Sequence, residues 1–151
     1  MKRVITLGEV MLRLKSPGHE RFFQSPVLEA TFGGGEANVA VGLARLGLNA
    51  AFVSAIPENP IGDACVAELR KHGVDTALLA RQGDRLGIYF LEAGANQRPS
   101  VVVYDRAASA IAEAQSGDFD WDAIFGNADW FHVTGITPAI SAGTSALASG
   151  K

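Results

Sequence analysis

The stretch that decides the fold runs from Gly33 to Gly47 and reads GGGEANVAVGLARLG. Three consecutive glycines stand directly before a segment, Asn38 through Leu46, whose apolar residues recur at helical spacing, and Gly47 follows as a stop for that helix. Glycines before a helix permit backbone conformations that are closed to other residues, and they let a ligand approach the N–H groups at the helix start. The stretch therefore predicts a helix preceded either by an ordinary tight turn or by a ligand-binding loop.

The segments on either side of this stretch alternate between strands and helices. A second helix is expected with Asp63 as its N-cap and Gly73 as its stop. Apolar runs indicate strands at 4–7, 11–14, 27–32, 51–56 and 129–133, a short helix is expected at 120–125, and no element is assigned to residues 139–151. The succession of strand, glycine turn, helix, strand and helix predicts an α/β fold with a parallel sheet.

Two apolar runs in the middle of the chain interrupt this alternation. Residues 87–92 read GIYFLE and residues 100–105 read SVVVYD, and a polar stretch at 94–99 separates them. They predict an antiparallel hairpin that is apolar on both faces. A hairpin of this kind is not stable alone in water, so we expect a ligand on one side and a partner chain on the other.

Composition limits the class of protein. The 151 residues are 48% hydrophobic and 19% charged, which is typical of one globular domain with a packed core. The net charge of −3 and the scattered Lys and Arg residues argue against a nucleic-acid partner. No apolar run approaches the roughly 20 residues that span a bilayer, and charges interrupt the N-terminal segment before it could serve as a secretion signal. We therefore expect a cytoplasmic protein without a membrane partner, and expect the single cysteine, Cys65, to be a buried, inert thiol.

Several common kinds of site lack support. The glycine run is not a dinucleotide-binding fingerprint, because Asn38 stands where the third glycine would be. The end of the chain, Gly150-Lys151, lacks the earlier glycine of a phosphate-binding loop. The three histidines share no metal-ligand spacing, and no serine has a His and Asp arrangement that would activate it. Glu9, which follows the first strand, is interpreted as a structural or exposed carboxylate and is left out of the predicted site.

The glycine run, Asn38 and the helix that ends in Ala-Arg-Leu-Gly resemble the amino-terminal signature of ribokinase-like sugar kinases of the PfkB family. The opening strand with Gly8-Glu9, the Ile61-Gly62 turn, the sequence HGVD at 72–75 and the hairpin stand in the matching order along nearly the whole chain. GIYF at 87–90, YDRAASA at 104–110 and HVTGITP at 132–138 are similar to 2-keto-3-deoxygluconate kinases in particular. The resemblance implies that residues 1–151 are the amino-terminal part of a ribokinase-like kinase domain. The implied fold is a truncated Rossmann-like layered sheet, with a small β lid made of residues about 9–33 and 87–106.

The resemblance also implies a substrate site. Asn38, Gly34 and Gly35 would contact sugar hydroxyls, and an Asn side chain both donates and accepts, which suits a pair of hydroxyls. Tyr89 and Tyr104 would project from the lid onto the sugar. The remaining predicted residues are the backbone at Ile136, which would close the pocket, and Arg106, which would face a carboxylate of the substrate. This arginine is the reason to expect a sugar acid, 2-keto-3-deoxygluconate, and not a neutral sugar.

Two alternatives stay open. A fructokinase or another sugar kinase of the same family would not need Arg106 to meet a carboxylate. A non-catalytic sugar-binding or dimerising module is also compatible with the sequence, because no Gly-Ala-Gly-Asp occurs in it. The family keeps its catalytic aspartate, anion-hole glycines and nucleotide site in its carboxy-terminal part. The resemblance therefore implies ATP and Mg²⁺ as cofactors that bind beyond residue 151, no catalytic residue within this chain, and a homodimer formed through the lid.

Overall fold

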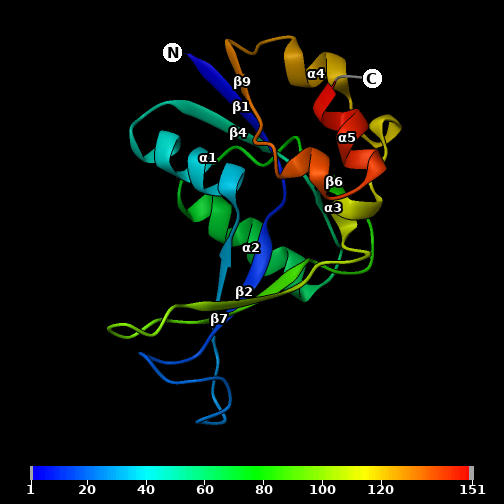
Figure 1. The fold of residues 1–151 in the computed structure, drawn as a ribbon. Coiled ribbons are helices and arrows are strands. Elements are labelled where there is room, and N and C mark those ends of the chain that lie inside the picture. The colour runs from blue at the N-terminus through cyan, green and yellow to red at the C-terminus, as the bar shows by residue number, and fades with distance from the viewer. Residues whose placement is uncertain (1, 150–151) are drawn as a thin grey trace.

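A three-stranded parallel sheet forms the centre of the molecule (Figure 1). The computed structural model describes residues 2–149. Strand β1 (Arg3–Leu7) lies between β4 (Asn49–Val53) and β9 (Trp130–His132) and pairs in parallel with both. This arrangement and the helices around it confirm the predicted α/β class.

Helices cover both faces of the central sheet. On one face, α1 (Gly35–Arg45) and α2 (Pro60–Lys71) pack around the buried side chain of Phe52. On the other face, Ile5 and Leu7 pack with residues of α3 (Ala110–Glu113), α4 (Trp121–Phe125) and α5 (Ala142–Ser149). Figure 1 shows α1 and α5 on opposite sides of β1. Alternate residues of a strand point to opposite faces, so a short apolar strand such as β1 can be buried by two layers of helices.

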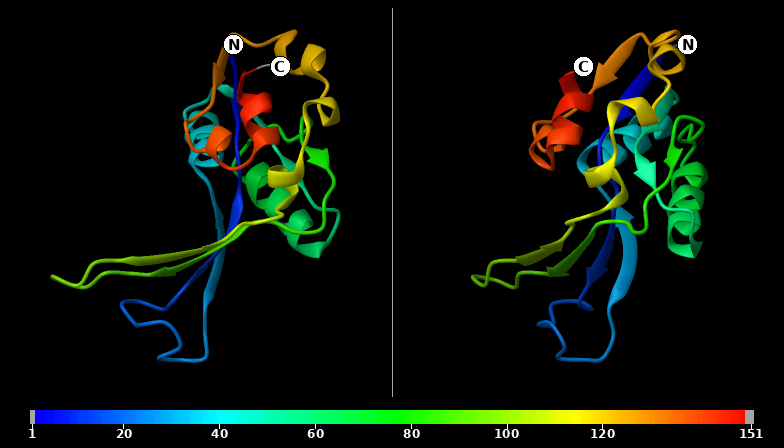
Figure 2. Two further views of the ribbon diagram at one scale, coloured as in Figure 1. Left: turned by 45° about the vertical axis from the view of Figure 1, so that its right-hand side comes forward. Right: turned by 90° about the vertical axis from the view of Figure 1, so that its right-hand side faces the viewer.

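A second, four-stranded sheet projects from this body, and we call it the lid sheet (Figure 2). Its strands are β3 (Glu29–Gly33), β2 (Met11–Lys15), β7 (Ile88–Glu92) and β8 (Val101–Asp105), in that spatial order. The predicted hairpin is confirmed, because β7 and β8 pair in antiparallel fashion. The two central strands, β2 and β7, pair in parallel although they are far apart in the sequence.

Several predicted boundaries were wrong. Helix α1 begins at Gly35 and not at Asn38. Helix α2 begins at Pro60, and its N-cap is Asn59, whose Oδ1 accepts hydrogen bonds from the backbone N–H groups of Ile61 and Gly62 at 3.1 and 2.9 Å. Asp63, the predicted cap, lies inside the helix and pairs with Arg81 at 2.6 Å. An Asn followed by Pro at the first helical position is a strong start signal that the Asp63 assignment overlooked.

Other differences concern short elements. The strand predicted at 51–56 is interrupted at Ser54, and the residues after it form β5 (Ala55–Ile56), which pairs with β6 (Ala80–Arg81). The Ala-, Ser- and Gly-rich segment, to which no element was assigned, contains α5 within its described part. Two 3₁₀ turns, η1 (Ser116–Asp118) and η2 (Thr137–Ala139), complete the elements.

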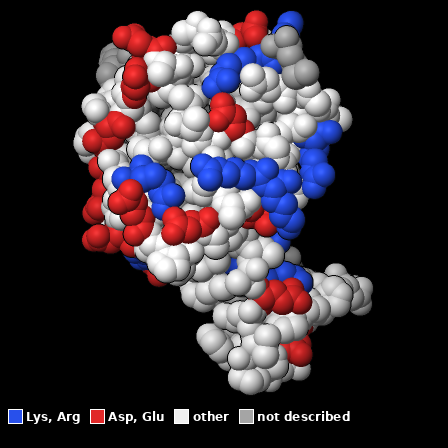
Figure 3. All heavy atoms as spheres, turned by 180° about the vertical axis from the view of Figure 1, so that it is seen from behind, with Lys and Arg blue, Asp and Glu red and all other residues white. Residues whose placement is uncertain are grey.

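The predicted helix stops and the buried thiol are confirmed. Gly47 and Gly73 follow α1 and α2 with φ angles of +85° and +84°, a left-handed conformation that favours glycine. Cys65 is fully buried, and this burial raises the pKa of its thiol to about 12. No helix within residues 2–149 is long and apolar enough to cross a membrane. On the face shown in Figure 3, charges of both signs are interspersed over the body.

Candidate functional site

The residues predicted to bind the substrate surround one cavity of about 230 Å³ between the start of α1, the lid sheet and the turn after β9. The structure brings together all of them: Gly34, Gly35, Asn38, Tyr89, Tyr104, Arg106 and Ile136. The same cavity is lined by residues that the sequence reasoning did not include: Glu9, Met11, Glu36, Val102 and Thr137. The cavity thus combines hydroxyl, amide, carboxylate and guanidinium groups with a few apolar side chains.

The glycine run lies at the cavity, but the reason for glycine at position 34 differs from the expected one. Gly34 is the N-cap of α1 and has extended φ and ψ angles of −177° and 151°, a conformation open to any residue. Its role is close approach, because a Cβ atom at Gly34 would overlap the backbone carbonyl oxygen of Glu9. No side chain caps the start of α1. Apart from the N–H of Glu36, which interacts with its own carboxylate, the first N–H groups of this helix are therefore available to oxygen atoms of a ligand in the cavity.

Glu36, in the first turn of α1, connects the helix to the turn after β9. Its Oε1 atom accepts hydrogen bonds from the Thr134 hydroxyl at 2.6 Å, the Thr134 backbone N–H at 3.0 Å and the Thr137 hydroxyl at 2.8 Å. Burial by itself would raise the pKa of the Glu36 carboxyl, but these hydrogen bonds outweigh it and hold the pKa below its ordinary value. The ionised carboxylate therefore fixes the threonine turn, and with it Ile136, against the start of α1.

Two tyrosines and one arginine come from the lid sheet and its exit. Tyr89 and Tyr104 are cross-strand partners on β7 and β8, and their ring centroids lie 6.0 Å apart. The guanidinium of Arg106 lies 5.6 Å from the centroid of the Tyr104 ring, within the range of a cation–π contact. The lid sheet thus presents two phenol groups and one cation together at the cavity.

The structure gives Arg106 a partner that the sequence reasoning did not foresee. Its Nη2 atom forms an ion pair with Oε2 of Glu9, and Ser109 Oγ donates to Oε1 of the same carboxylate at 2.9 Å. Glu9 is only 4% exposed, so the expectation of an exposed carboxylate was wrong and that of a structural one is confirmed. A Glu placed two residues after a buried first strand was the available signal. Its partner across the fold could not be identified from the sequence.

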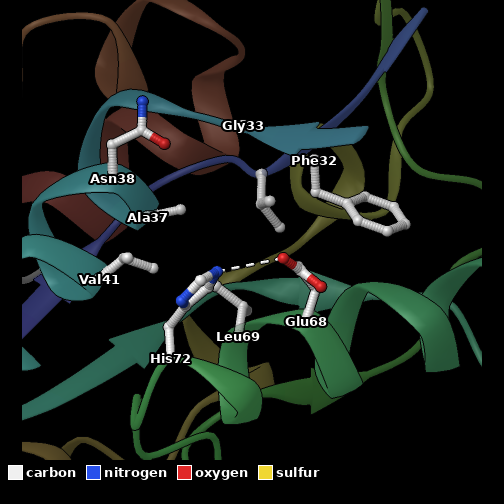
Figure 4. Close-up of a pocket in the computed structure, with 9 residues that line it drawn as sticks. Phe32, Gly33, Ala37, Asn38, Val41, Glu68, Leu69 and His72 are labelled. Carbon is white, nitrogen blue, oxygen red and sulfur yellow. Dashed lines mark hydrogen bonds and ion pairs between the residues drawn. The ribbon is translucent and has the colours of Figure 1, made fainter. Parts of the chain in front are cut away.

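A smaller cavity of about 130 Å³ lies on the other side of the first turns of α1, between this helix and α2. Figure 4 shows His72 and Glu68 next to each other on the α2 side of this cavity, while the carboxamide of Asn38, on α1, points away from the pair. Arg45 Nη2 donates to His72 Nδ1 at 2.8 Å, so His72 donates through Nε2 to Glu68 Oε1 at 3.1 Å. This chain of hydrogen bonds joins the C-terminal ends of the two helices.

Comparisons with known proteins agree with this geometry. The model of the pfkB family of carbohydrate kinases matches residues 1–148. A 2-dehydro-3-deoxygalactonokinase from Haloferax volcanii is 41% identical over 91% of this chain, and a 2-dehydro-3-deoxygluconokinase from Bacillus subtilis is 31% identical over 91%. The chain spans 43% of the length of each of these relatives.

Solved structures give the same result. The crystal structure of a 2-dehydro-3-deoxygluconokinase from Thermotoga maritima has 57% sequence identity and a TM-score of 0.91, and the match covers 93% of this chain and 43% of that one. A sugar kinase from Pyrococcus horikoshii in complex with ATP has 27% identity and a TM-score of 0.71, covering 79% of this chain and 39% of that one. The glycine run, the lid sheet and the family match lead to one conclusion: this chain belongs to the pfkB family of carbohydrate kinases.

Proposed function

We propose that this chain is the sugar-recognising part of an ATP-dependent kinase that phosphorylates a 2-keto-3-deoxy sugar acid, with 2-keto-3-deoxygluconate as the first candidate. The observation that carries the proposal is the position of Arg106. Its guanidinium lies in the wall of a cavity that also contains the uncapped start of α1 and two tyrosines. A guanidinium recognises a carboxylate through charge-assisted, directional hydrogen bonds, and a neutral sugar has no carboxylate to offer.

The remaining groups of the cavity suit the hydroxyls of the same substrate. Asn38 can donate and accept, the N–H groups at the start of α1 can donate, and the phenols of Tyr89 and Tyr104 can do either. The names of the relatives support the acid over fructose, but they include both the gluconate and the galactonate form. The two forms share the keto acid end that Arg106 would bind, so the proposed substrate class includes both configurations.

Phosphoryl transfer requires groups that we do not assign to this chain. Within residues 2–149, no group of three or more His, Cys, Asp or Glu side chains is placed to hold a metal ion. The family and a structural neighbour in complex with ATP support the nucleotide as the phosphoryl donor. We assign none of the described residues to ATP or Mg²⁺, and we expect the isolated 151-residue chain to show no phosphotransfer.

A homodimer formed through the lid sheet is a further part of this proposal. All residues of β8 are exposed, and Val101, Val102, Val103 and Tyr104 are each at least 42% exposed on an edge strand. An exposed, apolar edge strand is suited to covering by a second copy of the same sheet. The dimer would also close the outer side of the cavity, which Val102 and Tyr104 line.

The proposed function is tested with the gene product that contains residues 1–151. We expect it to release ADP from ATP in the presence of 2-keto-3-deoxygluconate or 2-keto-3-deoxygalactonate, with a much higher kcat/KM than for fructose. A preference for fructose would favour the fructokinase alternative. ATP binding without turnover of any sugar would contradict a kinase, and binding of a sugar without ATP binding would favour the non-catalytic module.

A further inference from the structure

The chain segments that connect the lid sheet to the body of the molecule either contain Glu9 or contact it. The chain enters β2 from β1 through Glu9 itself, and it leaves β3 for α1 at Gly34. It enters β7 at Gly87 and leaves β8 for α3 at Arg106. A Cβ atom at Gly34 would overlap the backbone oxygen of Glu9, and one at Gly87 would overlap its Oε1. The crossings at Gly34 and Gly87 are therefore packed tightly against the backbone and the carboxylate of Glu9, respectively.

Both oxygen atoms of the Glu9 carboxylate already have partners. Oε2 is paired with Arg106 Nη2, and Oε1 accepts from Ser109, the N-cap of α3. The Glu9 side chain is 3% exposed and the Arg106 side chain 25%, so little water competes with the ion pair. A carboxylate buried to this degree is retained only when it is paired and hydrogen-bonded.

The pairing determines the orientation of Arg106 and, through it, of the lid. Glu9 fixes one end of a planar guanidinium whose charge also lies over the ring of Tyr104, a residue of β8. The Nε–H of Arg106 has no hydrogen-bond partner among the described residues. Glu9 therefore occupies only part of the guanidinium, and the donors that remain are held in one plane at the cavity wall.

We propose that Glu9 is a positioning residue: it fastens the lid sheet to the body and holds Arg106 in the orientation in which Arg106 binds the substrate carboxylate. The second half of this inference rests on the proposed function, whereas the fastening of the lid sheet does not. Both oxygens of Glu9 are engaged with side chains of the protein and its side chain is only 3% exposed, so the proposal assigns its effect to Arg106 and not to contact with the substrate.

The first experiment is a double-mutant cycle in the gene product that contains this chain. Glu9→Gln keeps the shape of the side chain and removes its charge. We expect it to raise KM for the 2-keto-3-deoxy acid about tenfold or more, with a smaller change in kcat. The reason is that Arg106 loses the charge-assisted hydrogen bond to Glu9 that orients it toward the substrate. In an Arg106→Ala background the same substitution is expected to change KM little, because the group that it positions is already gone. If Glu9→Gln raises KM by the same factor with and without Arg106→Ala, the positioning role is wrong.

The second experiment does not depend on the substrate. Hydrogen exchange of the backbone amides at 88–92 and 101–105 is expected to be faster in Glu9→Gln than in the unmodified protein. The matched control is Glu29→Gln, which removes a carboxylate of the lid sheet that pairs with Lys15 at 3.2 Å, away from the crossings. Unchanged exchange in Glu9→Gln, or an equal change in both variants, would contradict the fastening role. If no 2-keto-3-deoxy acid is phosphorylated, the proposed function fails, and the exchange data still decide this part of the inference.

Discussion

The carboxylate of Glu36 accepts a hydrogen bond from the hydroxyl of Thr137 at 2.8 Å, and this contact joins the start of α1 to the turn after β9. Both residues are almost fully buried and both line the cavity. The contact therefore connects the glycine run near the beginning of the chain with the Thr-Gly-Ile-Thr segment near its end. Its strength depends on the ionisation of Glu36, because a charged acceptor binds hydroxyl and N–H donors more strongly than a neutral one.

Glu36→Gln is expected to lower the free energy of unfolding at pH 7 by about 1.5–3 kcal/mol, the range for hydrogen bonds to charged groups. The pKa of Glu36 is depressed in the folded state, so its contribution is present above the ordinary value of 4.5 and is lost as the pH falls through the lower folded value. The difference between the two proteins in urea unfolding should therefore shrink as the pH is lowered below 4.5. Glu58→Gln, at an exposed position, serves as the control, and equal stabilities at pH 7 would contradict the prediction.

Gly34→Ala and Gly35→Ala should have opposite effects on stability. A methyl group at Gly34 would overlap the backbone oxygen of Glu9, and forced overpacking typically costs about 1–3 kcal/mol. A methyl group at Gly35 meets nothing within 4 Å, and Gly to Ala in a helix stabilises by about 0.4–1 kcal/mol. The midpoint of denaturant unfolding measures the change in stability of each variant. Similar midpoints for the two variants would show that close approach at Gly34 is unimportant.

Arg106→Ala in the gene product is expected to raise KM for the 2-keto-3-deoxy acid about ten- to hundredfold, and KM for fructose much less. Arg106→Lys should recover only part of the loss, because an ammonium lacks the planar fork. The lysine variant also keeps a positive charge beside the buried Glu9, so thermal unfolding of both variants separates binding from stability. An equal increase in KM for both sugars would show that Arg106 is structural and would favour the fructokinase alternative.

Val103→Asp should weaken the proposed homodimer. Val103 is 50% exposed in the middle of the edge strand β8, and a charge there would have to be desolvated in a lid-to-lid interface. Sedimentation measures the change in association. Leu46→Asp places the same charge at a residue of the body that is 80% exposed, and it should leave association unchanged. An unmodified protein that sediments as a strict monomer would contradict the dimer itself.

The sequence predicted the elements whose signals are local. Gly47 and Gly73 identified the helix ends because a left-handed residue after a helix favours glycine, and the apolar runs around Tyr89 and Tyr104 identified the β7–β8 hairpin. The start of α2 was misplaced, since the capping role of Asn59 depends on which of two nearby polar residues turns its side chain toward the helix.

The contacts that complete the cavity could not be predicted, because they join residues that are distant in the sequence. Nothing local to Glu9 indicates that its partners are Arg106 and Ser109, and nothing local to Glu36 indicates Thr134. The resemblance to sugar kinases identified seven of the residues that line the cavity. It did not identify the two buried carboxylates that hold these residues in place.

The parallel pairing of β2 with β7 has a consequence for how the chain folds. Each half of the lid sheet, β2 with β3 and β7 with β8, is antiparallel and can form from segments that are close in sequence. Pairing Leu12 with Ile88 requires closure of a long loop that contains α1, β4 and α2. Closing this loop lowers the conformational entropy of the chain before stabilising contacts between the strands can form. The lid sheet, and with it the cavity, therefore cannot form from local segments alone and depends on the packing of the elements between its two halves.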